Sequence, residues 1–265
     1  MGGPLALLLA AAVPTLLVSL YFDWLDRERP EPRSSLRRVY LAGACSFAPV
    51  LLLEMLLKSR GHDLSGAALA AWDAFVVAAA PEEGAKMACI ALLVWRRSSF
   101  DEHMDGITYG VRAGLGFALV ENLGYFWMAP PDQLFDVLVL RSALLVPGHA
   151  AWGAIAGYWA ARRRFSGDGL GVVGGWLCAV ALHGAYDFCI FSMALQRGEG
   201  WLSAMAFVAA LSVLVGSVIW MRRLATSALR SDELLDQAIM QRATPTPRHR
   251  DERSREGARG DSRGD

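Results

Sequence analysis

The chain has 265 residues, of which 54% are hydrophobic, and its formal net charge is zero. So apolar a composition excludes an ordinary soluble domain, and the charge balance gives no reason to expect nucleic acid as a partner. A membrane-spanning helix needs about 20 apolar residues, and the sequence offers that length seven times. We therefore predict an all-α fold, a polytopic membrane helix bundle of about seven transmembrane helices. The predicted spans are 4–22, 39–57, 67–95, 106–128, 138–161, 169–195 and 201–221.

The positive charges between these spans alternate from one side to the other. Four segments on one side (23–38, 96–105, 162–168 and 222–265) carry 5, 2, 3 and 10 of the 26 Lys and Arg residues. The segments on the other side carry three. The positive-inside rule then places the N-terminus outside and the C-terminus in the cytoplasm. We expect a multi-pass protein of the cell (inner) membrane, and the preference for Arg over Lys suggests a bacterial source.

Two parts of unequal length follow from this pattern. Residues 1–223 form the membrane domain, with its polar core between 67 and 191, and residues 224–265 form a cytoplasmic tail. The tail opens with a possible amphipathic helix around 224–242 and then becomes rich in charged residues, Gly and Pro, which is typical of disorder. The four cysteines all fall inside spans without a C-x-x-C motif, so they are expected to be packing residues.

In chain order, the first two spans carry little charge. The span 4–22 has no ionisable residue, and the span 39–57 has only Glu54, close to its outer end. Asp73 lies similarly near the outer start of the third span. Side chains at such positions can reach the membrane surface, and we interpret both residues in that way.

The third span holds the most unusual stretch of the sequence. Pro81, Glu82, Glu83 and Lys86 interrupt an apolar run that extends from 67 to 95. A charge at the centre of a bilayer costs roughly 2.5 kcal/mol or more, so these side chains need buried partners. Pro81 predicts a kink or a new helix start directly before the two carboxylates. Lys86 lies one turn on and can pair with either glutamate, whose side chains point about 100° apart.

Candidate partners lie on the next three spans. Glu121 and Asn122 are deep in the fourth span, His149 is in the fifth, and His183 is in the sixth with Asp187 four residues later. Asp187 is at the offset that lets it accept a hydrogen bond from a ring nitrogen of His183. Glycines four residues apart allow close helix contacts. They are Gly106, Gly110 and Gly114 in the fourth span and Gly153 and Gly157 in the fifth.

These groups share one depth. At about 1.5 Å per residue, Glu83, Glu121, His149 and His183 all lie roughly 20 Å from the cytoplasmic ends of their spans. A single polar layer indicates a single site. Its residues suit hydrolysis, by a metal such as Zn²⁺ that activates water or by a glutamate that acts as general base without metal. The residues alone leave both schemes open.

Four motifs on successive spans resemble those of a known family. They are Glu82-Glu83-x-x-Lys86, Phe117-x-x-x-Glu121-Asn122, His149-x-x-x-Gly153 and His183-x-x-x-Asp187. The region from about 67 to 191 resembles the PrsW family of intramembrane proteases, which is distantly related to the CAAX prenyl proteases and the bacteriocin-immunity group.

The resemblance implies hydrolysis of a peptide bond in a membrane-bound protein, which in characterised members is an anti-sigma factor. It implies that Glu82 and Glu83 are water-activating or ligand carboxylates and that Glu121, His149 and His183 complete the catalytic site. Lys86, Asn122 and Asp187 would support them. The expected ligands of a Zn²⁺ ion are Glu83, Glu121, His149 and His183.

Three other functions are compatible with the residues. A proton- or ion-coupled transporter would also bury acidic groups, although it predicts polar residues at several depths. A metal-dependent lipid-amide hydrolase could use the same ligands. A non-catalytic descendant that acts in immunity or as a scaffold is the third.

Overall fold

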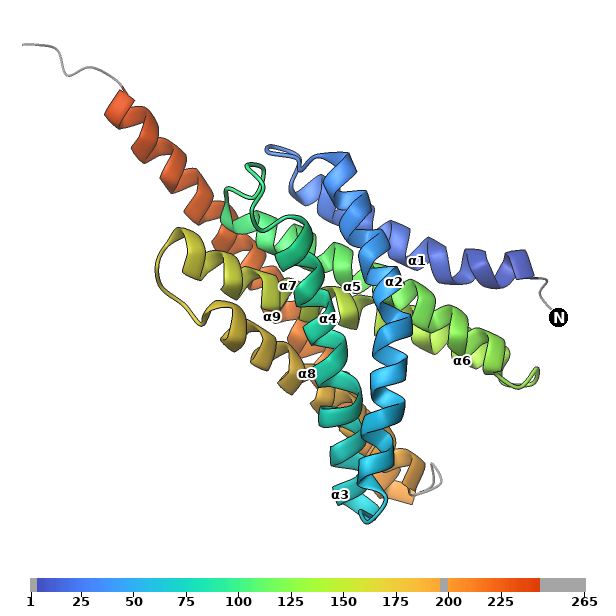
Figure 1. Ribbon diagram of the computed structural model, residues 1–265. Helices are drawn as coiled ribbons and strands as arrows, with labels where there is room; N and C mark the ends of the chain where they lie inside the picture. The colour runs from blue at the N-terminus through green and yellow to red at the C-terminus, as the bar shows by residue number, and fades with distance from the viewer. Residues whose placement is uncertain (1–3, 196–199, 244–265) are drawn as a thin grey trace, which may run out of the picture.

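The chain folds into a bundle of helices, with no strand in the part that the computed structural model describes, residues 4–195 and 200–243 (Figure 1). The all-α class is therefore confirmed. The helices are α1 (Pro4–Leu25), α2 (Arg33–Lys58), the 3₁₀ turn η1 (Ser59–Gly61), α3 (Gly66–Ala71), the π-helix η2 (Trp72–Ala79), α4 (Ala80–Leu93), α5 (His103–Met128), α6 (Leu134–Leu140), the π-helix η3 (Arg141–Leu145), α7 (Val146–Phe165), α8 (Gly171–Leu195) and α9 (Gly200–Ala243).

Five helices among the described residues are long and apolar enough to cross a membrane, two fewer than predicted. They are Leu5–Leu25, Arg33–Gly61, Leu134–Phe165, Gly171–Leu195 and Gly200–Gln241. The two remaining predicted spans form helices of matching length, α3–η2–α4 and α5, but these carry the buried charged groups. Because neighbouring helices cover them, their polar side chains do not face lipid.

Helix α9 is longer than the last predicted span. It continues from the apolar segment through residues 224–243 without a break, and Figure 1 shows its C-terminal part running out from the other helices. The predicted helix around 224–242 is thus an extension of the last span. The disorder predicted beyond Ala243 lies outside the described residues.

Helix α5 is the centre of the bundle, and α7 is its most extensive neighbour. Gly106 faces Gly157, Gly110 faces Gly153, and Gly114 faces the backbone of His149. A Cβ atom added at any of these glycines of α5 would overlap a carbonyl oxygen or carbon of α7. The glycine spacing seen in the sequence therefore allows the two backbones to touch.

Two helices that reach the site are built in the same way. The π-helix η2 leads into α4, which has Pro81 in its first turn, and the π-helix η3 leads into α7, which has Pro147 there. Proline cannot donate a hydrogen bond to the preceding turn, and a π-helical turn is a local widening that accommodates such a defect. The predicted break before Glu82 is thus a widened turn followed by a helix restart, with the polar residues placed directly after it.

The segments rich in Arg meet at one end of the bundle, which we call the basic end (residues 23–38, 96–105, 162–168 and 222–243). Asp232 of α9 accepts hydrogen bonds from the backbone N–H groups of His103 (2.9 Å) and Met104 (3.0 Å) and so caps α5. Arg29 pairs with Glu102 and with Asp236, the latter at 2.8 Å. The extension of α9 therefore fastens the start of α5 to the segment between α1 and α2.

Buried carboxyl groups accompany these contacts. Asp26 and Glu102 are only 4% and 3% exposed. Burial, together with the charges of Glu102 and Asp105, raises the pKa of Asp26 to about 8. Burial raises the pKa of Glu102 to about 7, although its hydrogen bond with Arg29 acts in the opposite direction.

The glycine contact leads to a first prediction. Gly110→Val should lower the free energy of unfolding by about 1–3 kcal/mol, because the new side chain must push α5 away from Gly153. Thermal unfolding in detergent micelles measures the change. Gly216→Val is the matched control, since a Cβ there meets nothing within 4 Å. Equal stability of the two variants would show that the close contact is not needed.

The carboxyls of the basic end predict how stability depends on pH. The folded state keeps protons on Asp26 and Glu102 that the unfolded chain, with ordinary carboxyl pKa values near 4, releases. Through these two groups, the free energy of unfolding should therefore fall as the pH rises from about 4 to about 8. The double variant Asp26→Asn/Glu102→Gln should flatten this dependence in pH-resolved thermal unfolding. Asp63→Asn, an exposed site at the other end of the bundle, should leave it unchanged.

Candidate active site

The two adjacent glutamates of α4 have different surroundings. Glu83 is fully buried, and its Oε1 accepts a hydrogen bond from Lys86 Nζ at 2.6 Å. Glu82 turns the other way: its Oε2 is 3.7 Å from Lys86 Nζ and accepts no hydrogen bond. Neighbouring helix positions point about 100° apart, which is why the two carboxylates cannot share one environment.

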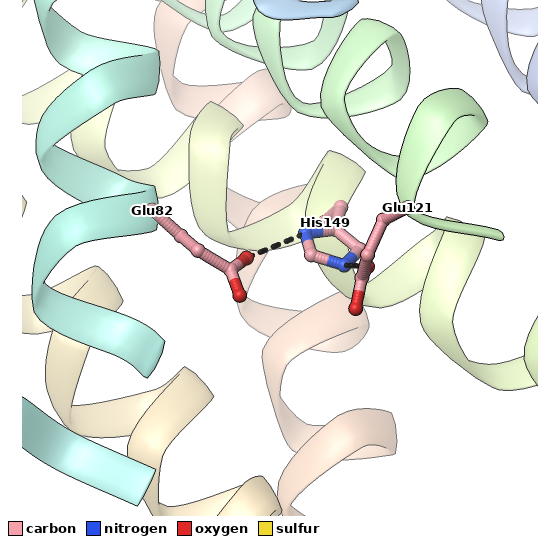
Figure 2. Close-up of side chains that lie close together, drawn as sticks. All are labelled: Glu82, Glu121 and His149. Carbon is pink, nitrogen blue, oxygen red and sulfur yellow. Dashed lines mark hydrogen bonds and ion pairs between the residues drawn. The ribbon is translucent and has the colours of Figure 1, made fainter. Parts of the chain in front are cut away.

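His149 of α7 links Glu121 on α5 to Lys86 on α4. Its Nε2 is 2.9 Å from Oε2 of Glu121 on α5, and its Nδ1 is 2.7 Å from Lys86 Nζ. The Lys86 ammonium can only donate, so Nδ1 accepts and Nε2 carries the hydrogen that is donated to Glu121. Figure 2 shows Glu82 and Glu121 on opposite sides of the His149 ring, each directed toward it.

His183 of α8 completes the layer. Its Nδ1 is 2.9 Å from Glu83 Oε1, and its Nε2 is 3.2 Å from Asp187 Oδ2 and 4.0 Å from Glu82 Oε2. The ring stacks on Trp152, with centroids 4.1 Å apart and an angle of 11° between the planes. Asp187 thus faces one nitrogen of His183, while Glu83 holds the other.

Three of these side chains could hold a metal ion. Glu82, Glu121 and His149 each offer one ligand atom, and these atoms lie within 4.8 Å of one another. This group differs from the predicted ligand set, since it contains Glu82 in place of Glu83 and does not include His183. Glu83 contacts Lys86 and His183 through Oε1, and its Oε2 is buried without a hydrogen bond. Unlike Glu82, Glu83 is not among the residues that line the cavity described below.

The donor set fits such an ion if a ring nitrogen of His149 exchanges its contact with Lys86 or Glu121 for the metal. Glu82 Oε2 is a buried acceptor without a hydrogen bond, and a buried polar atom of this kind needs a partner. The layer holds four carboxylates (Glu82, Glu83, Glu121 and Asp187) against two permanent cations, Lys86 and Arg141. With neutral histidines its formal charge is −2. A divalent cation or two protons would balance it.

Arg141 is a member of this layer that the motifs did not reveal. It lies in η3, where its Nη2 is 2.7 Å from Glu121 Oε1 and its Nε donates to Asn122 Oδ1 at 2.8 Å. Its guanidinium also covers the ring of Tyr125 at 3.6 Å. One signal in the sequence could have identified it, because a lone Arg inside an apolar span requires a buried acidic partner.

A cavity of about 570 Å³ opens beside these residues. Glu82, Glu121, Arg141, His183 and Asp187 line its inner end. The rest of the wall is mainly apolar and comes from α2, η2, α5, η3 and α8. A substrate in the cavity would therefore meet Glu82 and His183 directly.

Comparisons with known proteins identify a matching family. A family model described as "PrsW family intramembrane metalloprotease" matches residues 31–232. No solved structure gives a significant match.

Several curated relatives are similar over most of their length. "Protease PrsW" of Clostridioides difficile (strain 630) is 30% identical over 194 residues, which cover 70% of this chain and 79% of the relative. "Protease PrsW" of Bacillus subtilis (strain 168) is 29% identical over 71% of this chain and 84% of its own. The protein of the same name from Geobacillus kaustophilus (strain HTA426) is 29% identical, with 71% and 80% covered. The chain is thus a multi-pass membrane protein that belongs to the PrsW family of intramembrane metalloproteases.

Proposed function

We propose that the chain hydrolyses a peptide bond of a membrane-bound protein in the cavity beside Glu82, Glu121, His149 and His183. The observation that carries this proposal is the buried Glu82 Oε2, which has no hydrogen bond and lies where the cavity meets the candidate metal ligands. Glu82 lines the cavity, and a carboxylate without a hydrogen bond on one oxygen can accept a proton from a water molecule that attacks there.

The metal of this family would be held by Glu82, Glu121 and His149. When bound there, it would polarise the scissile carbonyl and make water more acidic. One oxygen of Glu82 suffices as a ligand, and the other stays available for the proton. Nitrogen and oxygen donors of this kind suit Zn²⁺.

His183 is the second proton-handling group of the proposal. Glu83 fixes its Nδ1, so that Nε2 faces the cavity between Glu82 and Asp187. The proton that Glu82 takes from water can pass to Nε2, which is 4.0 Å from Glu82 Oε2. As the C–N bond breaks, Nε2 donates this proton to the leaving nitrogen, and Asp187 stabilises the imidazolium before that transfer. The products are a carboxylate and an amine. Glu83 and Lys86 act here as positioning residues.

Arg141 positions Glu121 in this scheme. The carboxylate of Glu121 lies between Arg141 on one side and His149 on the other, and Asn122 holds the guanidinium from a third direction. Without Arg141, a carboxylate that is largely buried would lose its permanent cation. Glu121 would then lose the orientation that directs it toward His149.

The orientation of the chain in the membrane is also part of the proposal. The four basic segments lie at one end of the bundle, which supports a cytoplasmic basic end and a C-terminus in the cytoplasm. The N-terminus is then outside. The relatives named above are bacterial proteins. A bacterial cell membrane and a regulatory substrate such as an anti-sigma factor are the setting that we infer.

The proposal predicts a cleavage reaction that depends on Glu82. Purified protein in liposomes should cleave members of a panel of single-span membrane proteins, with new N-termini identified by mass spectrometry. Glu82→Gln should lower the rate by about 10²-fold or more, because the amide cannot accept the proton. Glu28→Gln, an exposed site at the basic end, is the control and should keep the rate.

Metal content is read in the same preparation. Wild-type protein should bind about one Zn²⁺ per chain, and His149→Ala should bind less. Removal of the metal from wild-type protein by a chelator should lower its cleavage rate in proportion. Cleavage that survives Glu82→Gln would contradict the proposed role of Glu82. Hydrolysis of N-acyl lipids without any cleaved peptide bond would favour the lipid-amide hydrolase instead.

The Arg141–Glu121 pair gives a prediction about stability. Arg141→Met should cost about 3–5 kcal/mol of unfolding free energy, since it strands a buried carboxylate. Adding Glu121→Gln should recover most of that loss, so a double-mutant cycle should show strong coupling between the two positions. Arg60→Met, at an exposed arginine of η1, is the control. Additive effects of the two substitutions would show that the pair does not act as a unit.

A further inference from the structure

The cavity does not end at the catalytic layer but extends toward the end of the bundle where α2 meets η1. Lys58 and Asp73 line it there, and Glu82 lines it at the inner end. Asp73 precedes Glu82 by nine residues on one helical rod, a distance of about 13 Å along the axis. An extended peptide rises about 3.3 Å per residue, so the cavity can hold about four residues on one side of a scissile bond.

Most of the charged groups that line this cavity have partners in the protein. Lys58 Nζ is 3.8 Å from Asp73 Oδ2, Arg141 pairs with Glu121, and His183 pairs with Asp187. Glu82 is within 3.7 Å of Lys86. Each of these groups therefore has an ionic contact within the protein before any substrate enters.

Glu54 is the exception among the described residues that line the cavity. It lies in α2, one turn before Lys58, and is half-buried in the cavity wall. No hydrogen bond or ion pair joins its carboxylate to another residue in the described part of the chain, and it belongs to no candidate metal group there. Its lining neighbours on α2 are apolar, including Phe47, Leu51 and Met55. The sequence suggested a side chain that reaches the membrane surface, whereas the structure turns it inward.

A carboxylate in an apolar cavity within a membrane span is costly, at roughly 2.5 kcal/mol or more on insertion scales. A cationic partner offsets that cost, but no Lys or Arg among the described residues forms an ion pair with Glu54. Lys58, one turn along α2, contacts Asp73 instead. Glu54 lies between the mouth of the cavity and the catalytic layer, so a substrate that enters the cavity would pass it. The partner that charge complementarity favours is a basic side chain carried by that substrate.

We propose that Glu54 forms a subsite for a Lys or Arg side chain of the substrate, and that the protease selects membrane proteins with a basic residue near the cleaved bond. This inference rests on the proposed function. Glu54 lies one turn, about 6 Å, inside the level of Lys58. The basic residue is therefore expected two or three positions from the scissile bond.

The test is a library of single-span reporter proteins, randomised over eight positions at one membrane boundary and cleaved by the full-length protease in liposomes. Wild-type protein should enrich Lys and Arg at one position among the cleaved reporters, by about tenfold for a contact worth ~1.4 kcal/mol. Glu54→Gln should abolish this enrichment while reporters with neutral residues are still cleaved. Glu54→Lys should reverse it in favour of Asp and Glu.

Asp63→Lys is the matched control, because it makes the same charge change at the same end of the bundle on an exposed residue. It should leave the wild-type preference intact. Cleavage without basic enrichment, or with a preference that Glu54→Lys does not alter, would overturn the subsite. A library that is not cleaved at all would instead contradict the proposed peptidase activity, so the two failures are distinguishable.

Discussion

The backbone contact between α5 and α7 is the interaction on which the rest of this structure depends. Gly106, Gly110 and Gly114 remove the side chains that would separate the two helices. The last of these glycines faces the backbone of His149, and Glu121 lies two turns farther along α5. Because the helices touch there, the Glu121 carboxylate reaches the His149 ring at 2.9 Å. Larger residues at these glycine positions would separate Glu121 from His149, which are two of the three candidate metal ligands.

The contact between α5 and α7 also brings together the groups that stabilise the buried charges. Carboxylates within a membrane bundle are stable only with partners, and here the partners come from the same helix and from neighbouring helices. Lys86 of α4 contacts Glu83 and His149, and Arg141 of η3 contacts Glu121. The excess of acid in the layer is what a divalent cation or protons would neutralise. A divalent cation bound in this layer would thus both neutralise its excess negative charge and supply the proposed chemistry.

The two π-helices explain how the polar residues come to face inward. Each π turn adds a residue to the helix and so rotates the following positions by roughly 100° relative to an ideal α-helix. The residues after η2 include Glu82 and Glu83, and those after η3 include His149. Pro81 and Pro147 lie at these restarts and fit the interrupted hydrogen bonding. Both π-helices contribute to the walls of the cavity, and irregular backbone within a membrane bundle is tolerated at such places.

The sequence by itself determined the helical class, the glycines that allow a close helix contact, and the layer of polar residues. Helical rise converts position into depth, and a charge in an apolar run can be recognised without coordinates. Only the tertiary structure decided that Glu82, and not Glu83, lines the cavity. It also decided that Arg141 pairs with Glu121 and that Glu54 faces the cavity. These outcomes depend on the direction of each side chain around its helix axis. The π turns and the packing of α2, α5 and α7 set that direction. It cannot be predicted from a regular helical period of 3.6 residues.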